Sequence, residues 1–286
     1  SGELIKDGVG VLTLSGVSSY SGQTSVNGGV LALNGTLSSG SMLVGTSGVL
    51  SVGASGLLSS STVLTIGGSA SFASVAQTVG TLGGVGALSL NNTALSVGDG
   101  IFSGEISGGG SLVKSSAGML VLSGSNTFSG GVELSGGTLE VGGNYGLGVG
   151  SLRMSGGVLS STSSVARTLG NALVLSGAIG FGDVSNSGAL VFTGNGTLVG
   201  DVSANVQSET TLNGEMSGGY GLTKTGVGTL TLNGVNTFSG ATVVSGGTLV
   251  GVSGAFGSTS SIAVNGARLS AVDYNSVAGL SVDGSG

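Results

Sequence analysis

Apolar and polar residues alternate along most of this chain with a period of two. Residues 9–15 read VGVLTLS and residues 228–233 read GTLTLN. In an extended strand every second side chain lies on the same face, so this pattern predicts short strands buried on one side. Ser-Gly, Asn-Gly, Gly-Gly and Asn-Asn pairs between the strands are typical of turns. The inward positions would be Leu12, Leu14, Leu120, Leu122, Leu230 and Leu232, and the outward ones Thr13, Val121 and Thr231.

Other short apolar runs have the same character, and no segment has a helical pattern. Leucines spaced i, i+3, i+4 and i+7 are missing, and each glycine inside a helix would cost about 1 kcal/mol. The chain is therefore predicted to be all-β, with no helices of note. The further strands are expected at 29–33, 41–44, 49–52, 63–66, 88–90, 173–175 and 262–264.

One block of sequence occurs three times, at residues 2–35, 110–143 and 220–254. The three lysines of the chain occupy the same position in each copy, and one aromatic residue per copy is followed by Ser-Gly. These lysines are Lys6, Lys114 and Lys224; the aromatic residues are Tyr20, Phe128 and Phe238; the matched glycines are Gly10, Gly118 and Gly228, and Gly16, Gly124 and Gly234. Such self-similarity is typical of stacked structural units.

Short strands between glycine turns could form an antiparallel sandwich or barrel, or a parallel β-solenoid. The repeats favour the solenoid, because equivalent side chains can then stack on one another in successive coils, whereas a sandwich has no reason to repeat its sequence. We expect a rod-like, right-handed parallel β-helix that runs continuously through residues 1–286, with divergent spacer coils between the copies and about 20 residues per coil. A thin core of small aliphatic side chains agrees with an aromatic content of 4% and no tryptophan.

Composition excludes several classes of protein. Gly accounts for 63 of 286 residues, but mean hydropathy is +0.54 and net charge only −6, which argues against disorder, and a chain without proline is no collagen. Three lysines and three arginines form no basic patch for nucleic acid, and no apolar run is long enough for a membrane-spanning helix.

The chain also has few of the residue types that catalysis or metal binding requires. Without Cys or His there is no disulfide, no thiolate or imidazole metal site and no Ser-His triad. Twelve acidic residues are spread along the chain, Glu105 and Glu215 are repeat equivalents, and the glycine run at 194–200 is followed by no helix that could bind a phosphate. We predict no enzyme activity, no catalytic or metal-binding residues and no cofactor. The aspartates considered singly are Asp7, Asp99, Asp183, Asp201, Asp273 and Asp283.

The repeats resemble the autotransporter-associated β-strand repeat of passenger domains in bacterial type V secretion. That pattern is roughly Gly-x-Leu-x-Lys-x-Gly-x-Gly-x-Leu-x-Leu-x-Gly-x-Asn-x-aromatic-x-Gly and ends in Gly-Gly-Thr-Leu. The second copy departs from it at Ser116, and the first has Ser18 for the asparagine and Val30 for the threonine. The third copy matches at Gly221, Leu222, Lys224, Gly226, Gly228, Leu230, Leu232, Gly234, Asn236, Phe238, Gly240, Gly246, Gly247, Thr248 and Leu249.

The resemblance implies a β-solenoid passenger or stalk, extracellular or on a Gram-negative cell surface, anchored in the outer membrane through a region outside this sequence. The translocator barrel of the parent protein would then be a partner. Repeats of this family are scaffolding, so no catalytic residue carries over. We expect the lysines to be solvated at a turn rather than to form a ladder of ligand sites. We expect the aromatic residues to pack at a corner of the coil rather than to stack on sugar rings.

Two functions remain. The first is a structural stalk or adhesin that contacts a host, an abiotic surface or a sister cell. The second is a filament subunit that stacks head to tail on itself, suggested by ends at 1–8 and 277–286 that lack a polar cap. Both ends would equally suit one window of a longer chain, which we expect this sequence to be.

Overall fold

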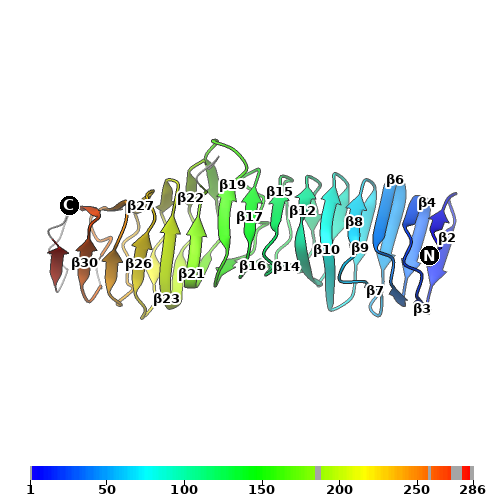
Figure 1. Ribbon diagram of the computed structural model, residues 1–286, viewed down its shortest axis with the longest axis horizontal. Coiled ribbons are helices and arrows are strands. Elements are labelled where there is room, and N and C mark those ends of the chain that lie inside the picture. Colours follow the sequence, from blue (N-terminus) through cyan, green and yellow to red (C-terminus); the bar gives the residue numbers. More distant parts are fainter. Residues whose placement is uncertain (1, 184–187, 257–258, 272–278, 284–286) are drawn as a thin grey trace. The chain divides into compact units, whose positions relative to one another are not determined.

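The computed structural model describes residues 2–183, 188–256, 259–271 and 279–283. These residues contain no helix and consist of short strands joined by turns, in coils that pair with one another in parallel (Figure 1). The predicted all-β parallel solenoid is therefore confirmed. The chain divides into two compact units, the first comprising residues 1–133 and 145–150, the second residues 134–144 and 151–286. A single continuous solenoid over 1–286 stays a prediction.

In the first unit, parallel pairing joins each coil to the next. Leu4 pairs with Thr24, Ser41 with Val63, and Ala76 with Ala94, so the coils differ in length from one another. The strands are β1 (Leu4–Lys6), β2 (Val11–Leu14), β3 (Val17–Ser18), β4 (Thr24–Leu33), β5 (Thr36–Leu37), β6 (Ser41–Val52), β7 (Leu57–Leu58), β8 (Val63–Ile66), β9 (Ser69–Phe72), β10 (Ala76–Gly84), β11 (Ala87–Ser89), β12 (Ala94–Phe102), β13 (Ile106–Ser107), β14 (Ser111–Lys114) and β15 (Met119–Leu122). Strand β16 (Val132–Leu134) contains the division between the units.

The second unit repeats this construction, with a second face formed by the parallel sheet β20-β22-β24-β27-β29-β31. Its strands are β17 (Thr138–Val141), β18 (Leu152–Met154), β19 (Val158–Ser161), β20 (Arg167–Leu169), β21 (Leu173–Phe181), β22 (Leu190–Phe192), β23 (Gly196–Val206), β24 (Thr210–Leu212), β25 (Met216–Ser217), β26 (Leu222–Thr225), β27 (Thr229–Leu232), β28 (Thr242–Val244), β29 (Thr248–Gly251), β30 (Ile262–Asn265), β31 (Arg268–Ala271) and β32 (Leu280–Asp283). Between β21 and β23 the register shifts after Leu175, and the longer strand accommodates extra residues around Val199–Asp201.

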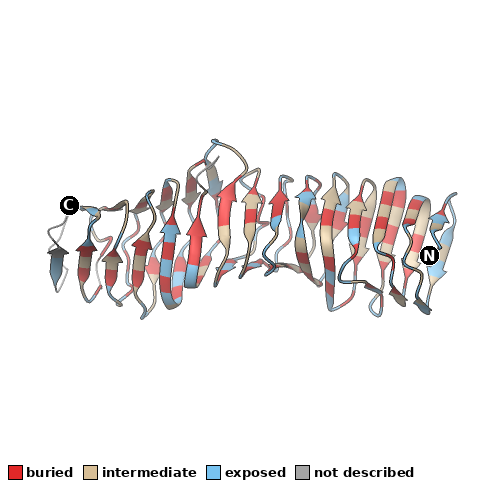
Figure 2. Cartoon of the chain, in the orientation of Figure 1, coloured by how far each residue is buried: buried red, intermediate tan, exposed pale blue. Residues whose placement is uncertain are grey.

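The core of each unit consists of columns of inward side chains, which Figure 2 shows as buried bands along the strands. In the first unit, one column runs through Leu31, Leu50, Ala70, Leu88 and Ile106, each paired with the next and at most 3% exposed. Each strand therefore buries alternate residues against the coils on either side, which removes apolar surface from water.

The predicted inward leucines follow this rule where a further coil covers them. Of the six, Leu120, Leu122, Leu230 and Leu232 are buried, whereas the first-coil pair Leu12 and Leu14 is half-buried. Val121, predicted to point outward, alternates with the inward Leu120 and Leu122 but is only 8% exposed. Strand alternation therefore predicts the inward side well but does not tell how far the outward side is covered.

One corner of the coil is occupied by a column of glycines, each stacked on the glycine of the coil before it. In the second unit the column is Gly194, Gly214 and Gly234. A Cβ on Gly214 or Gly234 would lie well under 3.0 Å from the carbonyl oxygen of the preceding glycine. The backbones are therefore in direct contact at this corner, and any side chain would separate the coils. Gly86, Gly104 and Gly124 form the equivalent column in the first unit.

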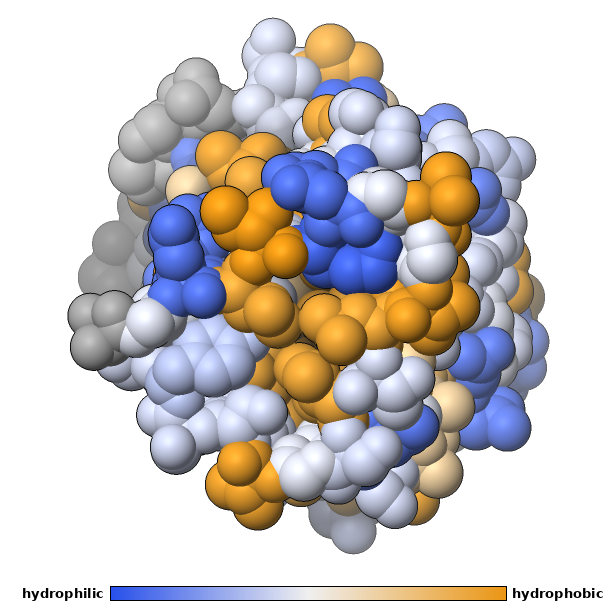
Figure 3. All heavy atoms as spheres, turned by 90° about the vertical axis from the view of Figure 1, so that its right-hand side faces the viewer, coloured by the Kyte–Doolittle hydropathy of each residue, from blue (hydrophilic) through white to orange (hydrophobic). Residues whose placement is uncertain are grey.

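Figure 3 views the end that bears the first coil, where hydrophobic residues gather at the centre of the face. The exposed side chains of this coil include Ile5, Val11 and Val17, which are 53%, 66% and 80% exposed. Strand β4 covers the coil from one side through its pairing with β1 and β2. The inward Leu12 and Leu14 are also only half-buried at this end, whereas the inward Leu31 and Leu50 of the following coils are fully buried.

Candidate functional site

Each sequence repeat forms more than one coil, so its two halves stack on each other. In the third copy, β26 pairs in parallel with β28 and β27 with β29, with Leu222 beside Thr242 and Thr229 beside Thr248. The first copy pairs β1 with β4 and β2 with β4 in the same way. A side chain near the start of a repeat can therefore contact the turn near its end.

The lysine of the repeat makes this contact. The Nζ atom of Lys224 donates hydrogen bonds to the carbonyl oxygens of Thr225 at 2.9 Å, Gly226 at 2.9 Å and Gly246 at 3.0 Å. The first two carbonyls belong to its own coil and the third to the next coil. We call this group of three carbonyl oxygens around one ammonium the lysine clamp. Because Lys224 is fully buried, the prediction of a solvated turn lysine was wrong.

The other two copies place their lysines similarly. Lys6, 7% exposed, donates to Asp7 O and Gly8 O at 2.8 Å and to Gly28 O at 2.9 Å. Lys114 is fully buried and donates to the carbonyl oxygen and hydroxyl of Ser116. Ser116 stands where the repeat pattern has a glycine. Its hydroxyl therefore gives Lys114 a side-chain acceptor that a glycine could not provide.

Glycine turns aim the carbonyl groups at the ammonium. Gly226 has φ +77° and Gly247 has φ +58°, conformations that side chains disfavour. In the first copy, a Cβ on the equivalent Gly29 would also come within 2.8 Å of Lys6 Nζ. The lysine and the final Gly-Gly of the repeat are therefore two halves of one structural feature.

Burial sets the electrostatics of the clamps. Desolvation lowers the pKa of Lys224 from 10.5 to about 8. Desolvation also lowers the pKa of Lys114, and the carboxylate of Asp99 opposes this effect. The ammonium of the third copy is thus held by carbonyl dipoles, whereas that of the second copy also has a carboxylate in its surroundings.

We expect the stability of the second unit to depend on the titration of Lys224. The folded chain releases this proton near pH 8, whereas the unfolded chain keeps it until pH 10.5. The unfolded state binds more protons between these values, so the free energy of unfolding should rise with pH there and be flat, for this group, below pH 8. Denaturation midpoints of the chain and of Lys224→Met, compared from about pH 7 to about pH 10, isolate this effect. A difference that stays constant with pH would contradict it.

A buried asparagine joins three successive coils in the second and third copies. Asn236, 2% exposed, accepts a hydrogen bond from Met216 N at 2.7 Å and donates one to Ala255 O at 2.7 Å. Asn126 does the same between Ile106 N at 2.8 Å and Gly146 O at 2.7 Å. The amide has one acceptor and one donor group on opposite sides, so it fits between one coil and the next.

Asn236→Ala should lower the free energy of unfolding by about 2 kcal/mol, because a buried N–H and a buried C=O lose their partners together. The matched control is Asn233→Ala, since Asn233 makes its side-chain hydrogen bond to Asn213 at the exposed surface and should change stability by less than about 0.5 kcal/mol. Urea denaturation followed by far-UV circular dichroism measures both. Equal losses of unfolding free energy in the two variants would show that the buried Asn236 amide stabilises the chain no more than an exposed asparagine does.

The aromatic residues of the repeats pack where the sequence predicted. Phe128 and Phe238 are fully buried or nearly so, at the corner after the asparagine. Tyr20 is half-buried and its hydroxyl shares a 2.8 Å hydrogen bond with the hydroxyl of Thr24. Buried rings cannot stack on a sugar, so the alternative of carbohydrate stacking is excluded for the two phenylalanines.

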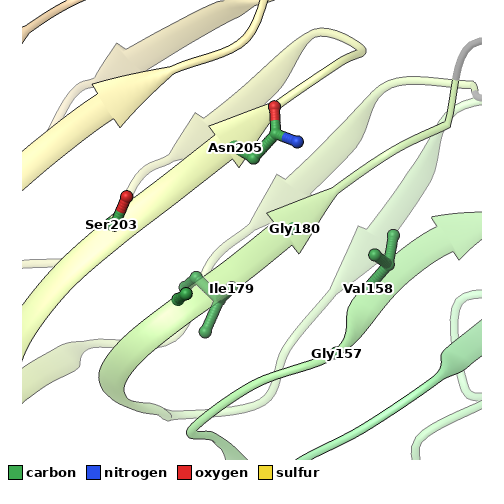
Figure 4. A pocket seen from close by; sticks show the side chains of 7 residues that line it. Gly157, Val158, Ile179, Gly180, Ser203 and Asn205 are labelled. Atoms are coloured by element: carbon green, nitrogen blue, oxygen red, sulfur yellow. The ribbon is translucent and has the colours of Figure 1, made fainter. Parts of the chain in front are cut away.

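The outer face of the second unit has a shallow hollow of about 300 Å³ that the sequence did not indicate (Figure 4). It exists because small residues in β21 lie between larger ones in β19 and β23: Gly180 pairs with Val158 on one side and with Asn205 on the other. Ser203 and Asn205 provide its polar side chains.

The two glutamates considered as repeat equivalents occupy equivalent places in the structure. Glu105 accepts a hydrogen bond from Thr127 at 3.0 Å, and Glu215 accepts one from Thr237 at 2.7 Å. Each threonine belongs to the coil after its glutamate. The glutamates therefore join neighbouring coils and do not face each other.

Two kinds of feature are missing from the described part of the chain. It holds no group of three or more His, Cys, Asp and Glu side chains arranged for a metal ion. It also has no helix of the length and apolarity needed to cross a membrane. Asp273, considered from the sequence, lies outside the described residues.

Comparison with known proteins gives a family for the repeats. The model of the passenger-associated-transport-repeat matches residues 4–33, 112–141 and 222–250, which are the three copies found in the sequence. The chain is 32% identical over 250 residues to the Adhesin BmaC autotransporter of Brucella suis biovar 1 (strain 1330), an alignment covering 84% of this chain and 7% of that protein. The chain thus spans a small fraction of the length of this relative. No solved structure matches. The three copies are therefore passenger-associated-transport repeats, set in a chain that folds as a parallel β-solenoid.

Proposed function

We propose that this chain is a non-catalytic, extracellular segment of a bacterial surface adhesin, exposed on the cell surface or secreted. It would present its outer faces to a host cell or an abiotic surface, and the translocator barrel of its parent protein would be its partner during export. The lysine clamp carries the proposal, because in the first and third copies the most distinctive residue of the repeat fastens one coil to the next, as expected of a scaffold.

Two observations support this interpretation. Each repeat uses its lysine ammonium, and the second and third copies also their asparagine amide, for internal hydrogen bonds, as expected of a scaffold. The relative named as an adhesin aligns over 84% of the chain, which makes adhesion the function to test first.

The test is display of the chain on a non-adherent bacterium, between a secretion signal and an outer-membrane anchor, with an epitope tag at its outer end. Bacteria displaying the chain should adhere to host cells or plastic more than bacteria displaying the anchor alone, and purified chain should compete. The matched control replaces the chain by an unrelated β-solenoid of equal length. Adhesion that the unrelated solenoid reproduces, or adhesion equal to that of the anchor, would overturn an adhesive role of this segment.

Filament formation is the alternative, and the comparisons provide no support for it. Negative-stain electron microscopy over a concentration series distinguishes the two. Particles of one size at every concentration agree with the adhesin segment, whereas fibres of uniform width that lengthen with concentration would replace the proposal by self-assembly.

A further inference from the structure

One sheet of the second unit presents a row of small, uncharged side chains on its outer face. Strands β24, β27, β29 and β31 pair in parallel there, and the row consists of Thr211, Thr231, Val250 and Ser270. Each of the first three stands between two buried residues of its own strand, so the row points outward. The methyl groups of the two threonines and the valine therefore meet solvent on three successive coils.

A second outward row, two residues earlier in each strand, has one charge at each end. In the order of the same four strands, it consists of Glu209, Thr229, Thr248 and Arg268. Glu209 and Arg268 are both exposed, and three strand spacings, about 14 Å, separate their backbones. The two charges therefore lie too far apart to pair with each other within one chain.

The charged row becomes complementary to itself when it is reversed. A two-fold axis that runs along the strands, midway between β27 and β29, brings a second copy face to face with the first and inverts the order of the strands. Glu209 of each copy then stands opposite Arg268 of the other, and Thr231 stands opposite Val250 in the uncharged row. Facing sheets pack about 10 Å apart, a gap that a glutamate and an arginine can span together.

Exposed apolar side chains border the same face. Val227 and Val235 occupy the turns before and after β27 and are 78% and 69% exposed. Because β27 lies next to the two-fold axis, both valines would lie beside the centre of the paired surface. Pairing would cover part of them and so remove apolar surface from water.

We propose that the face formed by β24, β27, β29 and β31 binds a second copy of this chain in antiparallel orientation. Two ion pairs between Glu209 and Arg268 fix that orientation, and the methyl groups between them lose their contact with water. A two-fold axis along the stack of coils would make the copies parallel. It would place Glu209 opposite Asn213 and form neither ion pair.

The size of the face makes this a weak interaction. Four strands about 4.8 Å apart, with five residues of about 3.3 Å along each, give roughly 300 Å² per copy. Stable complexes bury about 1,200–2,000 Å² in total, so the pair should form and separate readily.

The consequence of antiparallel pairing rests on the proposed function. Chains anchored on one surface project in the same direction, whereas chains on two facing surfaces are antiparallel. The pairing therefore suits contact between facing cells, where many weak contacts act together.

The experiment is sedimentation equilibrium of the purified chain from about 10 μM to about 1 mM, at low and at high salt. We expect a reversible equilibrium between monomer and dimer with a dissociation constant of about 10⁻⁴–10⁻³ M, weakened when salt screens the ion pairs. A chain that stays monomeric up to about 1 mM, or that forms a series of larger assemblies instead of a dimer, overturns the proposal. Because the chain is in solution, this result is independent of whether it adheres to host cells or plastic.

Charge reversal tests the two-fold arrangement. Arg268→Glu alone and Glu209→Arg alone should each weaken dimerisation at least about tenfold, because like charges then face each other at both ends of the row. An equimolar mixture of these two variants should pair again, because each supplies the charges that the other lacks. Circular dichroism checks that both variants keep the fold.

Arg153→Glu is the matched control for these variants. Arg153 is an exposed arginine on β18, in a different sheet of the same unit, so its reversal should leave dimerisation unchanged. Dimers that persist in both single variants, a mixture that fails to pair, or an equal loss in the control would each overturn the assignment of this face.

Discussion

Lys224→Met is expected to lower the free energy of unfolding of the second unit by about 3 kcal/mol. Methionine keeps the apolar stem of the side chain but has no donor, so the carbonyl groups of Thr225, Gly226 and Gly246 lose the ammonium that joins them. A buried acceptor without a partner costs roughly 1–3 kcal/mol, and removing the unfavourable burial of the charge recovers only part of the total loss. Urea denaturation gives the magnitude.

The damage should also be local. Contacts in a solenoid are made mainly with neighbouring coils, so amide hydrogen exchange should accelerate around residues 225–247 and remain slow near β19. Thr223→Val is the matched control, one position away on the outer side of the same strand, and should change stability by less than about 0.5 kcal/mol. A Lys224→Met chain as stable as the control, with unchanged exchange, would mean that the clamp does not fasten the coils.

Gly234→Ala should be at least as harmful, with a loss of about 3 kcal/mol or more. The added methyl would overlap the carbonyl of Gly214 and approach Glu215 N to 3.0 Å. These are backbone atoms of the preceding coil, which cannot move without breaking the parallel pairing of β24 with β27. Thermal unfolding of the purified variant measures the effect.

Gly219→Ala is the control for this substitution. A Cβ on Gly219 meets no heavy atom within 4 Å, and its φ is not in the left-handed region. The same chemical change should therefore be neutral or stabilise the chain by up to about 1 kcal/mol through the unfolded state. If both alanine variants behaved alike, the stacked glycines would owe their positions to something other than backbone contact.

Period-two alternation and repetition sufficed to predict the parallel solenoid, its strands and most of its core. The run predicted at 63–66 coincides with β8, and the corner position of Phe128 and Phe238 was correctly assigned. These features depend on local patterns that recur with the same spacing, which is the kind of information a single sequence contains.

The lysines were wrongly predicted to be solvated, because two arguments from the sequence conflict at their position. Lys224 follows Leu222 by two residues, so strand alternation places it inward, whereas the rarity of buried lysine argues for solvent. The resolution lies in carbonyl groups presented by turns at Gly226 and Gly247, whose positive φ values the sequence does not specify. Strand parity was the available signal, and it pointed to the correct side.

The hollow depends on which residues lie next to each other in successive coils, and the sequence does not identify these pairs. Ala94 pairs with Ser111, whereas Gly177 pairs with Val202, so the separation between partners in successive coils varies widely. Because the coils differ so much in length, the residue number of a partner in the next coil cannot be obtained by adding one fixed spacing. Gly180 and Asn205, which lie side by side at the hollow, therefore looked unrelated in the sequence.

Each coil has one corner, at the glycine column, that cannot accept added side chains, whereas other parts of the coil can accept extra residues. Backbone contact at Gly194, Gly214 and Gly234 leaves no room for an added side chain, yet the coil between β21 and β23 accommodates extra residues near Val199 without disturbing that column. Insertions and new surface loops can therefore accumulate by evolution at the variable corners while the stacking frame stays the same. The same separation offers protein engineers a place to graft binding loops onto this scaffold without redesigning its core.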